Sequence, residues 1–431
     1  MHHVILGAGP AGVIAAETLR RQAPQDRITL VGEEREAPYS RMAIPYLLMG
    51  NIGEEGTLLR KGARHFGDLR IEQVQARATQ VDVKARRVLL DNGAALDFDT
   101  LLVATGSTPA RAPIPGINLP GVHNCWTLAD ARSIMAGAAR GARVLQMGAG
   151  FIGCIILEAL AARGVQLTVV EMGDRMVPRM MGPAAGGMIR RWVEAKGVAV
   201  HTGTRVEAIT PGAGQTLDVK LSGGQTLNVD LVISATGVRP TIAFLQDSGV
   251  RCLQGVLTDE HMQTSVPGIY AAGDCAEAFD KVSGTTIVSA IQPNAAEQAR
   301  VAALNMAQQH QPGQRAALRG VTQINVLDTL GLISASFGNW QGVAGGEHAE
   351  LTDTASWRHL SLQFQDDVLV GCNSVGWTEH VGVMRGLVEG QVRLGEWKDR
   401  LLADPTQLMP AYLATAQAQG VWSGAADGRR R

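Results

Sequence analysis

One local pattern occurs twice in this chain and limits what it can fold into. In each copy an apolar strand runs into a glycine loop, a helical run follows, and a second apolar strand ends in an acidic residue. The first copy reads GAGPAG at residues 7–12 and has Glu33 and Glu34 after its second strand. The second reads GAGFIG at residues 148–153 and has Glu171 at the matching place. This spacing predicts two βαβ units, each with a parallel sheet.

The three glycines of each loop have separate tasks if the unit binds a dinucleotide. The first makes a tight turn, the second lets the backbone approach a pyrophosphate, and the third lets the helix pack closely on the strand. The phosphates then lie at the helix N-terminus, where unpaired N–H groups attract negative charge. A single glycine loop is a weak signal, because such loops also serve ordinary chain reversal. Two copies with nearly the same spacing favour two dinucleotide sites.

The acidic residue after each second strand lies about 20 residues past the loop, where a ribose hydroxyl needs an acceptor. In the second copy this residue is Glu171. A carboxylate there accepts from NADH and repels the 2′-phosphate of NADPH. Arg175 and Arg179 follow closely and argue the other way. We expect a preference for NADH.

Length and composition indicate a globular, multidomain protein. The chain has 431 residues, 45% hydrophobic and 18% charged, and a length of this kind predicts about three domains. The net charge of −1 gives no long-range attraction to nucleic acid or to an anionic membrane. We find no run of about 18 apolar residues of the kind that spans a bilayer. The sequence enters its first strand at once, so we expect no signal peptide and a cytoplasmic protein.

Five cysteines are scattered through the sequence, at positions 125, 154, 252, 275 and 372. Their odd number and wide spacing argue against a disulfide framework and against a metal or iron–sulfur site built by this chain. We expect most of them to be inert core thiols.

Other stretches mark the organisation of the chain. A proline-rich connector at residues 109–120 is typical of a domain crossing, because successive prolines hold the chain extended. Residues 37–52 contain Arg41 beside prolines and aromatic residues, which fits a ligand contact and a plain surface loop about equally.

From about residue 320 the chain is rich in tryptophan and shows no glycine loop. The tryptophans of this part are Trp340, Trp357, Trp377, Trp397 and Trp422. Tryptophan is enriched in interface hot spots, so this part is a candidate for docking a partner.

An ordered set of motifs in the chain resembles the two-dinucleotide flavoproteins of the pyridine nucleotide-disulfide oxidoreductase family. The set is GAGPAG, ATGS, GAGFIG, ATGVRP and GIYAAGD. The resemblance implies an α/β fold with two Rossmann-like domains, for FAD and NAD, and a C-terminal α+β interface domain. It divides the chain into an FAD-binding part at residues 1–112, an NAD-binding domain at 113–243, a second FAD-binding part at 244–319, and an interface domain at 320–422. We expect residues 423–431 to be disordered.

The resemblance also assigns cofactor-binding residues, but no catalytic residue and no metal ligand. On the FAD side they are Gly7, Gly9, Pro10, Ala11 and Gly12 at the pyrophosphate, Glu33 (or Glu34) at the ribose, Ala78 at the adenine, Ala104, Thr105 and Gly106 at the flavin edge, Gly273 and Asp274 at the ribityl chain, and Arg41 and Gln292. On the NADH side they are Gly148, Gly150, Phe151, Ile152, Gly153, Glu171, Thr236 and Gly237.

Departures from the family pattern indicate the branch. The disulfide branch has a cysteine pair in its first long helix, and the peroxidase and oxidase branch has one reactive cysteine near residues 41–46. This chain reads RMAIPY there. Rubredoxin and ferredoxin reductases of the family commonly carry a PLSK motif, and its lysine is absent here, where residues 44–46 take its place. Many relatives also carry a glutamate that contacts the nicotinamide, and this chain has Ile155 at that position. The chain most resembles the flavin modules of assimilatory nitrite reductase and the NADH-linked flavin subunits of phenylglyoxylate dehydrogenase and tungsten aldehyde oxidoreductase.

The resemblance, together with the missing redox cysteine, implies an FAD-containing subunit that moves electrons between NADH or NAD⁺ and the metal centres of a partner, such as an iron–sulfur subunit of an aldehyde or 2-oxoacid oxidoreductase. Without a redox cysteine, electrons that reach the flavin must leave to an outside acceptor. The alternatives are a stand-alone NADH oxidase or reductase using oxygen, a quinone or a ferredoxin-like acceptor, a non-catalytic assembly subunit, and an NAD-binding sensor. We expect no nucleic-acid or membrane partner.

Overall fold

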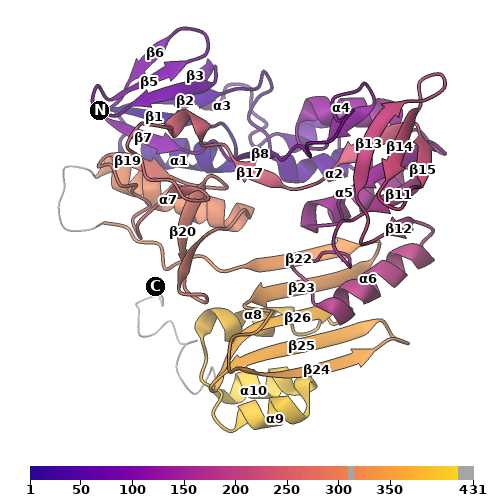
Figure 1. The fold of residues 1–431 in the computed structure, drawn as a ribbon. Coiled ribbons are helices and arrows are strands. Elements are labelled where there is room, and N and C mark those ends of the chain that lie inside the picture. Colours follow the sequence, from indigo (N-terminus) through magenta and orange to yellow (C-terminus); the bar gives the residue numbers. More distant parts are fainter. Residues whose placement is uncertain (309–314, 416–431) are drawn as a thin grey trace. The chain divides into compact units, whose positions relative to one another are not determined.

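The computed structural model describes residues 1–308 and 315–415, which form two compact units (Figure 1). The first unit contains Met1–Pro109 and Val238–Val321, and the second contains Ala110–Gly237 and the region that begins at Thr322. The units thus divide after residues 109, 237 and 321, where the sequence suggested 112, 243 and 319. The expected tail, 423–431, and Trp422 lie outside the described residues.

A parallel sheet in the order β19-β7-β1-β2-β3 forms the centre of the first unit. Its strands are β1 (His2–Leu6), β2 (Arg27–Gly32), β3 (Ile71–Gln75), β7 (Thr100–Val103) and β19 (Ile269–Ala271). Helices α1 (Pro10–Gln22) and α7 (Gln292–Ala307) pack against each other (Figure 1). All four residues of β7 are buried, as in a strand whose sheet is covered on both faces.

Small sheets and short helices complete the described part of this unit. The strands are β4 (Ala78–Asp82), β5 (Arg87–Leu90) and β6 (Ala95–Asp97), the pair β8 (Ser107–Pro109) and β17 (Val238–Pro240), and the group β18 (Val256–Leu257), β20 (Ala276–Asp280) and β21 (Thr285–Val288). The helices are η1 (Arg41–Ala43), α2 (Ile44–Leu48), η2 (Glu54–Thr57), α3 (His65–Asp68) and η3 (Ala243–Leu245).

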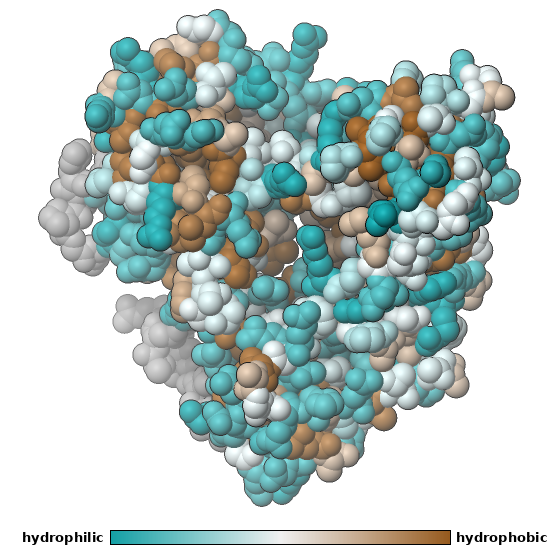
Figure 2. Space-filling view, in the orientation of Figure 1, coloured by the Kyte–Doolittle hydropathy of each residue, from teal (hydrophilic) through white to brown (hydrophobic). Residues whose placement is uncertain are grey.

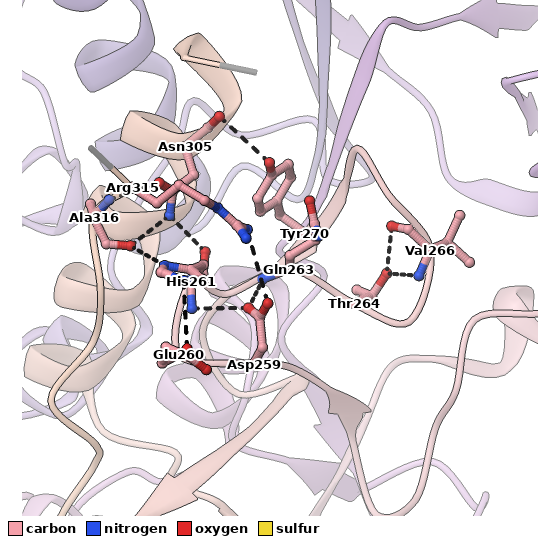
Figure 3. A network of polar contacts seen from close by, with 10 residues as sticks. All are labelled: Asp259, Glu260, His261, Gln263, Thr264, Val266, Tyr270, Asn305, Arg315 and Ala316. Carbon is pink, nitrogen blue, oxygen red and sulfur yellow. Dashed lines mark hydrogen bonds and ion pairs between the residues drawn. The ribbon is translucent and has the colours of Figure 1, made fainter. Parts of the chain in front are cut away.

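A polar network at the end of α7 holds the chain on both sides of residues 309–314 (Figure 3). The buried Asn305 accepts at 2.9 Å from the backbone N–H of Ala316. Its amide nitrogen donates at 2.9 Å to the carbonyl oxygens of His261 and Ala316. One side chain therefore satisfies three backbone groups, which fixes the return of the chain onto the first unit.

Replacing Asn305 with alanine is expected to lower the free energy of unfolding by about 2–4 kcal/mol, because buried backbone groups lose their partners. Denaturant unfolding followed by protein fluorescence measures this loss. Asn294→Ala on the same helix is the control, because Asn294 makes one bond, to the Ser289 hydroxyl, and its loss should cost about 1 kcal/mol or less. Equal losses in the two variants would contradict the role given to Asn305.

The second unit has a parallel sheet of the same kind, in the order β12-β11-β10-β16-β9. Its strands are β9 (Val122–Asn124), β10 (Arg143–Met147), β11 (Gln166–Val170), β12 (Ala199–His201) and β16 (Leu231–Ser234). The helices are α4 (Leu128–Gly137), α5 (Phe151–Ala162) and α6 (Pro183–Ala195), and β13 (Val206–Pro211), β14 (Leu217–Leu221) and β15 (Thr226–Val229) form an antiparallel sheet. The strand order reverses between β10 and β16, which is where open α/β sheets bind ligands.

The C-terminal part is an antiparallel sheet in the order β22-β23-β26-β25-β24 with helices. Its elements are β22 (Ile324–Thr329), β23 (Leu332–Gly338), β24 (Glu347–Asp353), β25 (Arg358–Gln365), β26 (Val368–Val375), α8 (Val381–Gly390), α9 (Trp397–Ala403), η4 (Pro405–Gln407) and α10 (Leu408–Thr415). Helix α6 packs on β26, and α5 packs on β22. Strand β22 begins at Ile324, and Val321, three residues earlier, forms an isolated bridge with Asp280.

The α/β class expected from the sequence is confirmed by the two parallel sheets. Hydrophilic residues cover much of the face seen in Figure 2, with hydrophobic residues in smaller groups among them. Within residues 1–308 and 315–415, the helices all fall short of the length and apolarity that a bilayer crossing requires.

Candidate functional site

The first glycine loop, residues 7–12, has the geometry that its three glycines predict. Gly7 has φ +112°, donates its N–H to the Val31 carbonyl at 2.8 Å, and leaves no room for a Cβ, which would overlap the Ala104 carbonyl oxygen. A Cβ on Gly12 would overlap the Gly7 carbonyl. A Cβ on Gly9, in contrast, would meet no described atom within 4 Å. Gly7 therefore allows the tight turn, and Gly12 allows the helix to pack closely on the loop. Gly9 leaves open space beside the backbone.

The second glycine loop, residues 148–153, repeats this geometry. Gly148 has φ +97° and donates to the Val170 carbonyl at 2.8 Å, and its Cβ would crowd the Ala235 carbonyl. A Cβ on Gly153 would crowd the Gly148 carbonyl, whereas one on Gly150 would meet no described atom within 4 Å. In both loops the first and third glycines leave no room for a side chain, whereas the second glycine does.

Helices α1 and α5 begin at these open positions. Their N-cap residues are Gly9 and Gly150, no described side chain caps either helix, and neither first turn contains an acidic residue. The first N–H groups of a helix lack partners within the helix, and they attract phosphate oxygens. Open space and uncapped N–H groups together fit the pyrophosphate of a dinucleotide at each loop.

The acidic residues after the second strands behave differently in the two units. The Glu171 carboxylate turns back onto its glycine loop and accepts from the N–H groups of Ala149 and Gly173, both at 2.7 Å. In the first unit, Glu33 is exposed after β2. Glu34 instead accepts from the Tyr39 hydroxyl at 2.5 Å and from Arg41 at 2.6 Å. The alternative acid is thus already engaged by residues of its own unit.

Arg175 and Arg179, which argued for NADPH, also differ. The guanidinium of Arg175 donates to the Met181 carbonyl at 2.8 Å and pairs with Asp174 at 2.7 Å. Arg179 is exposed. Arg175 therefore stabilises the backbone between residues 174 and 181. Of the two arginines, Arg179 is the one whose side chain is accessible to a phosphate.

The structure brings the other predicted residues of the first unit together around β7 and β19. Ala104, Thr105 and Gly106 follow β7, and Thr105 donates to the Thr241 carbonyl at 2.7 Å. Gly273 has φ +83° and lies so near Ala11 of the first loop that an added Cβ would come within 3.3 Å of its Cβ. Burial raises the pKa of Asp274, although the Ser107 hydroxyl, which donates at 2.9 Å, and the charge of Arg41 oppose the shift.

The remaining predicted residues occupy strand and helix ends. Ala78 begins β4 and is half-buried, and Gln292 begins α7 and accepts from the Ser40 hydroxyl at 3.2 Å. In the second unit, Phe151 and Ile152 begin α5, and Thr236 and the positive-φ Gly237 follow β16.

Two buried glutamines were missed from the sequence. The side chain of Gln298 on α7 accepts from the Gly273 N–H at 2.8 Å, and that of Gln146 on β10 donates to the carbonyls of Gly148 and Gly153 at 2.9 and 2.8 Å. A glutamine inside an otherwise apolar strand next to a glycine loop was the available signal for Gln146.

Comparison with known proteins decides the family. A model of the pyridine nucleotide-disulphide oxidoreductase family matches residues 1–304. The chain belongs to this family. As a pyridine nucleotide-disulphide oxidoreductase it uses FAD and NAD(H), and it is an FAD-dependent NAD(H) oxidoreductase, so the expected family, enzyme class and cofactors are confirmed.

Relatives within the family match different shares of the chain. The epsilon subunit of NADH-dependent phenylglyoxylate dehydrogenase from Aromatoleum evansii is 30% identical over 404 residues, 94% of this chain and 95% of that subunit. An NADH oxidase from Methanocaldococcus jannaschii is 31% identical over 316 residues, 71% of this chain and 70% of that protein. The solved structure of an NAD-dependent persulfide reductase from A. fulgidus has a TM-score of 0.84 at 28% identity and covers 92% of this chain and 78% of that one.

The cysteines of this oxidoreductase are all free thiols. Burial raises the pKa of each of them, and for Cys154 it does so to about 12. Cys275, the cysteine next to Asp274, is fully buried and donates to the carbonyls of Val103 and Ala272. Within the described residues, the His, Cys, Asp and Glu side chains form no group of three that could hold a metal ion. These thiols are protonated packing groups near neutral pH.

Replacing all five cysteines with alanine is therefore expected to leave electron transfer from NADH to a dye largely intact. The variant should lose stability by about 1 kcal/mol per buried site, because each change removes one sulfur atom from the core. Steady-state dye reduction, normalised to bound FAD, measures the activity. A single replacement that abolishes transfer while FAD stays bound would contradict the assignment.

Proposed function

We propose that this protein is the FAD- and NAD(H)-binding subunit of a multi-subunit oxidoreductase and moves electrons between NADH or NAD⁺ and the iron–sulfur or other metal centres of a partner subunit. The observation that carries the proposal is the extent of the similarity to the phenylglyoxylate dehydrogenase subunit, which covers 94% of this chain, whereas the family model ends at residue 304. The likeness thus includes the C-terminal part, which lies beyond the family model.

In this proposal the first unit holds FAD and the second holds NAD(H). The first glycine loop, Ala104 to Gly106, Gly273 and Asp274 form the FAD side, where structural contacts already bring them together. The second glycine loop and Glu171 form the NAD(H) side. When bound, these cofactors supply two-electron transfer chemistry, and the protein supplies binding, orientation and electrostatics. In this proposal the helix N-termini bind phosphates through their N–H groups, and the close backbone packing of each loop fixes its shape.

The exit of electrons is the second half of the proposal. The five cysteines of the described chain are free thiols, and their pKa values are raised. Such thiols do not suit an internal disulfide relay, because the thiolate is the reactive form. A partner with metal centres then receives or donates the electrons. Five free thiols also suit a reducing compartment, and we propose the cytoplasm as the location.

A stand-alone NADH oxidase is the second candidate, favoured by the relative from Methanocaldococcus jannaschii. The two functions separate in one experiment on the untagged protein in its native extract. Our proposal expects co-elution with a protein that contains iron and sulfide, and slow oxygen consumption by the isolated chain with NADH. Elution alone, together with rapid oxygen consumption, would favour the oxidase.

We propose that the C-terminal part docks the partner. The described tryptophans of this part are half-buried, and Arg358 and Arg400 stack on Trp377 and Trp397 at 5.2 and 4.4 Å. Trp357 instead packs edge-on against Trp192 of α6, at 5.2 Å, which makes it an internal contact. Replacing Trp377 or Trp397 with alanine should reduce co-elution with the partner about tenfold while FAD stays bound. Trp357→Ala is the comparison, and it should lower stability without a selective loss of the partner.

A further inference from the structure

Asn373 on β26 makes an unusual pair of bonds to a distant loop. Its side chain is almost fully buried. The amide nitrogen donates to the Met180 carbonyl at 2.9 Å, and the amide oxygen accepts from the Gly182 N–H at 2.9 Å. Both partners belong to the backbone of residues 172–182, which we call the coenzyme loop, between Glu171 and α6. One side chain therefore fixes both a donor and an acceptor of this loop from the C-terminal sheet.

The coenzyme loop is also attached, through Val177 in its middle, to the second glycine loop. The Val177 N–H donates to the Ala149 carbonyl at 2.8 Å, and the Ala149 N–H donates to the Glu171 carboxylate at 2.7 Å. Both backbone groups of Ala149 are thus held by Glu171 and the coenzyme loop. A displacement of this loop would move the carboxylate and the open side of the glycine loop together.

The backbone of the coenzyme loop is strained at Val177. This β-branched residue has φ +50°, in the left-handed region that side chains of its kind rarely occupy. Its carbonyl accepts from the N–H groups of Met180 and Met181, both at 2.9 Å, and Asn373 bonds to Met180 itself. A strained residue persists only when its surroundings fix it, and such residues gather at ligand sites. Asn373 is one of the groups that fix it.

We propose that Asn373 is a positioning residue for NAD(H): it holds the coenzyme loop in the strained conformation that places the Glu171 carboxylate at Ala149 of the second glycine loop. This inference rests on the proposed NAD(H) site. It assigns the C-terminal part a role in coenzyme affinity, in addition to the docking of a partner.

The first test measures coenzyme binding and not only activity. In the FAD-loaded full chain, Asn373→Ala should weaken NAD⁺ binding about tenfold by isothermal titration calorimetry. The KM for NADH should rise by a similar factor, whereas kcat for dye reduction at saturating NADH should stay within about twofold, because the loop affects binding rather than transfer. Asn305→Ala is the matched control, an equally buried asparagine bonded to backbone in the first unit. It should lower thermal stability and leave NAD⁺ affinity unchanged. Equal NAD⁺ affinity in the parent and in Asn373→Ala would overturn the proposal.

Asn373→Asp supplies a conservative variant. Its protonated carboxyl group can accept from Gly182 and donate to Met180, as the amide does, whereas its ionised form can only accept. The cross-strand neighbours Ser336 and Ser361 carry no charge, whereas Arg175, which donates to the adjacent Met181 carbonyl, favours the ionised form and opposes the effect of burial. The NAD⁺ affinity of this variant relative to the parent should therefore recover as pH falls from about 8 to about 5, since burial raises the pKa of a carboxyl group. A constant ratio over this range would overturn the two-bond account.

A third variant separates this inference from the proposed site. In a Glu171→Ala background, Asn373→Ala should weaken NAD⁺ binding further by about twofold or less, because the group that it positions is gone. If Glu171→Ala alone leaves NAD⁺ binding unchanged, the proposed NAD(H) site fails. If Glu171→Ala weakens binding but the two effects multiply in full, the site stands and the role of Asn373 is wrong.

Discussion

Replacing Gly9 with alanine is expected to yield a folded protein that loses FAD during purification, and replacing Gly150 with alanine a yellow protein that binds NADH only weakly. In each case affinity for one cofactor should fall by about two orders of magnitude, because the methyl group occupies the space through which the pyrophosphate approaches the backbone. Both glycines have φ near −75° in the structure, −76° and −74°, which alanine adopts without strain. Flavin absorbance of the purified variants and calorimetric titration with NAD⁺ measure the two affinities.

Other glycines provide the controls for this pair. A Cβ on Gly67 or Gly223 also meets no described atom within 4 Å, and neither residue has a positive φ. Alanine at these positions should leave both cofactors bound. Gly12→Ala and Gly153→Ala are unsuitable, because their Cβ atoms would crowd the backbone and disturb the fold. Full FAD occupancy in Gly9→Ala, or unchanged NAD⁺ binding in Gly150→Ala, would show that the loops have been assigned wrongly.

The second large effect is expected at Glu171. Replacing it with alanine should weaken NADH binding by about 1–3 kcal/mol, because one charge-assisted hydrogen bond is lost. The preference for NADH over NADPH should fall further, since the charge that repels the 2′-phosphate is gone and the exposed Arg179 remains. Flavin reduction at varied NADH and NADPH measures both quantities.

A change of net charge alone should not produce this result. Glu194→Ala removes the same charge from the second unit, where Glu194 pairs with Arg190 on the surface of α6. It should leave the affinities for NADH and NADPH unchanged, because exposed pairs contribute little. If Glu194→Ala changed the affinities for NADH and NADPH as much as Glu171→Ala does, there would be no reason to place Glu171 at the ribose.

The two glycine loops were predictable from the sequence because each glycine meets a local requirement of backbone conformation or packing. Gly7 and Gly148 need positive φ, Gly12 and Gly153 need close packing, and all of these lie within one short motif. The C-terminal sheet was harder to predict. Strand β23 carries Ser334 and Ser336 at buried positions, so its sequence lacks the apolar pattern that predicts a buried strand.

Contacts between distant residues were beyond sequence reasoning. Asn373 bonds to residues 191 and 193 positions away, and nothing in the local pattern of β26 marks it. Arg175 was an argument for NADPH when only its charge was known, and its bond to the Met181 carbonyl changed that interpretation. In both cases the function of the side chain depends on which backbone group the fold brings near it.

Electron transfer to metal centres is the central claim, and one measurement on the anaerobically reduced chain tests it most directly. The FAD-loaded chain is reduced with NADH and then mixed with an oxidised iron–sulfur protein or, in parallel, with air-saturated buffer. Our account predicts that the visible absorbance of the flavin returns quickly as the clusters become reduced, and returns slowly in air. Rapid return in air with no reduction of the clusters would contradict it.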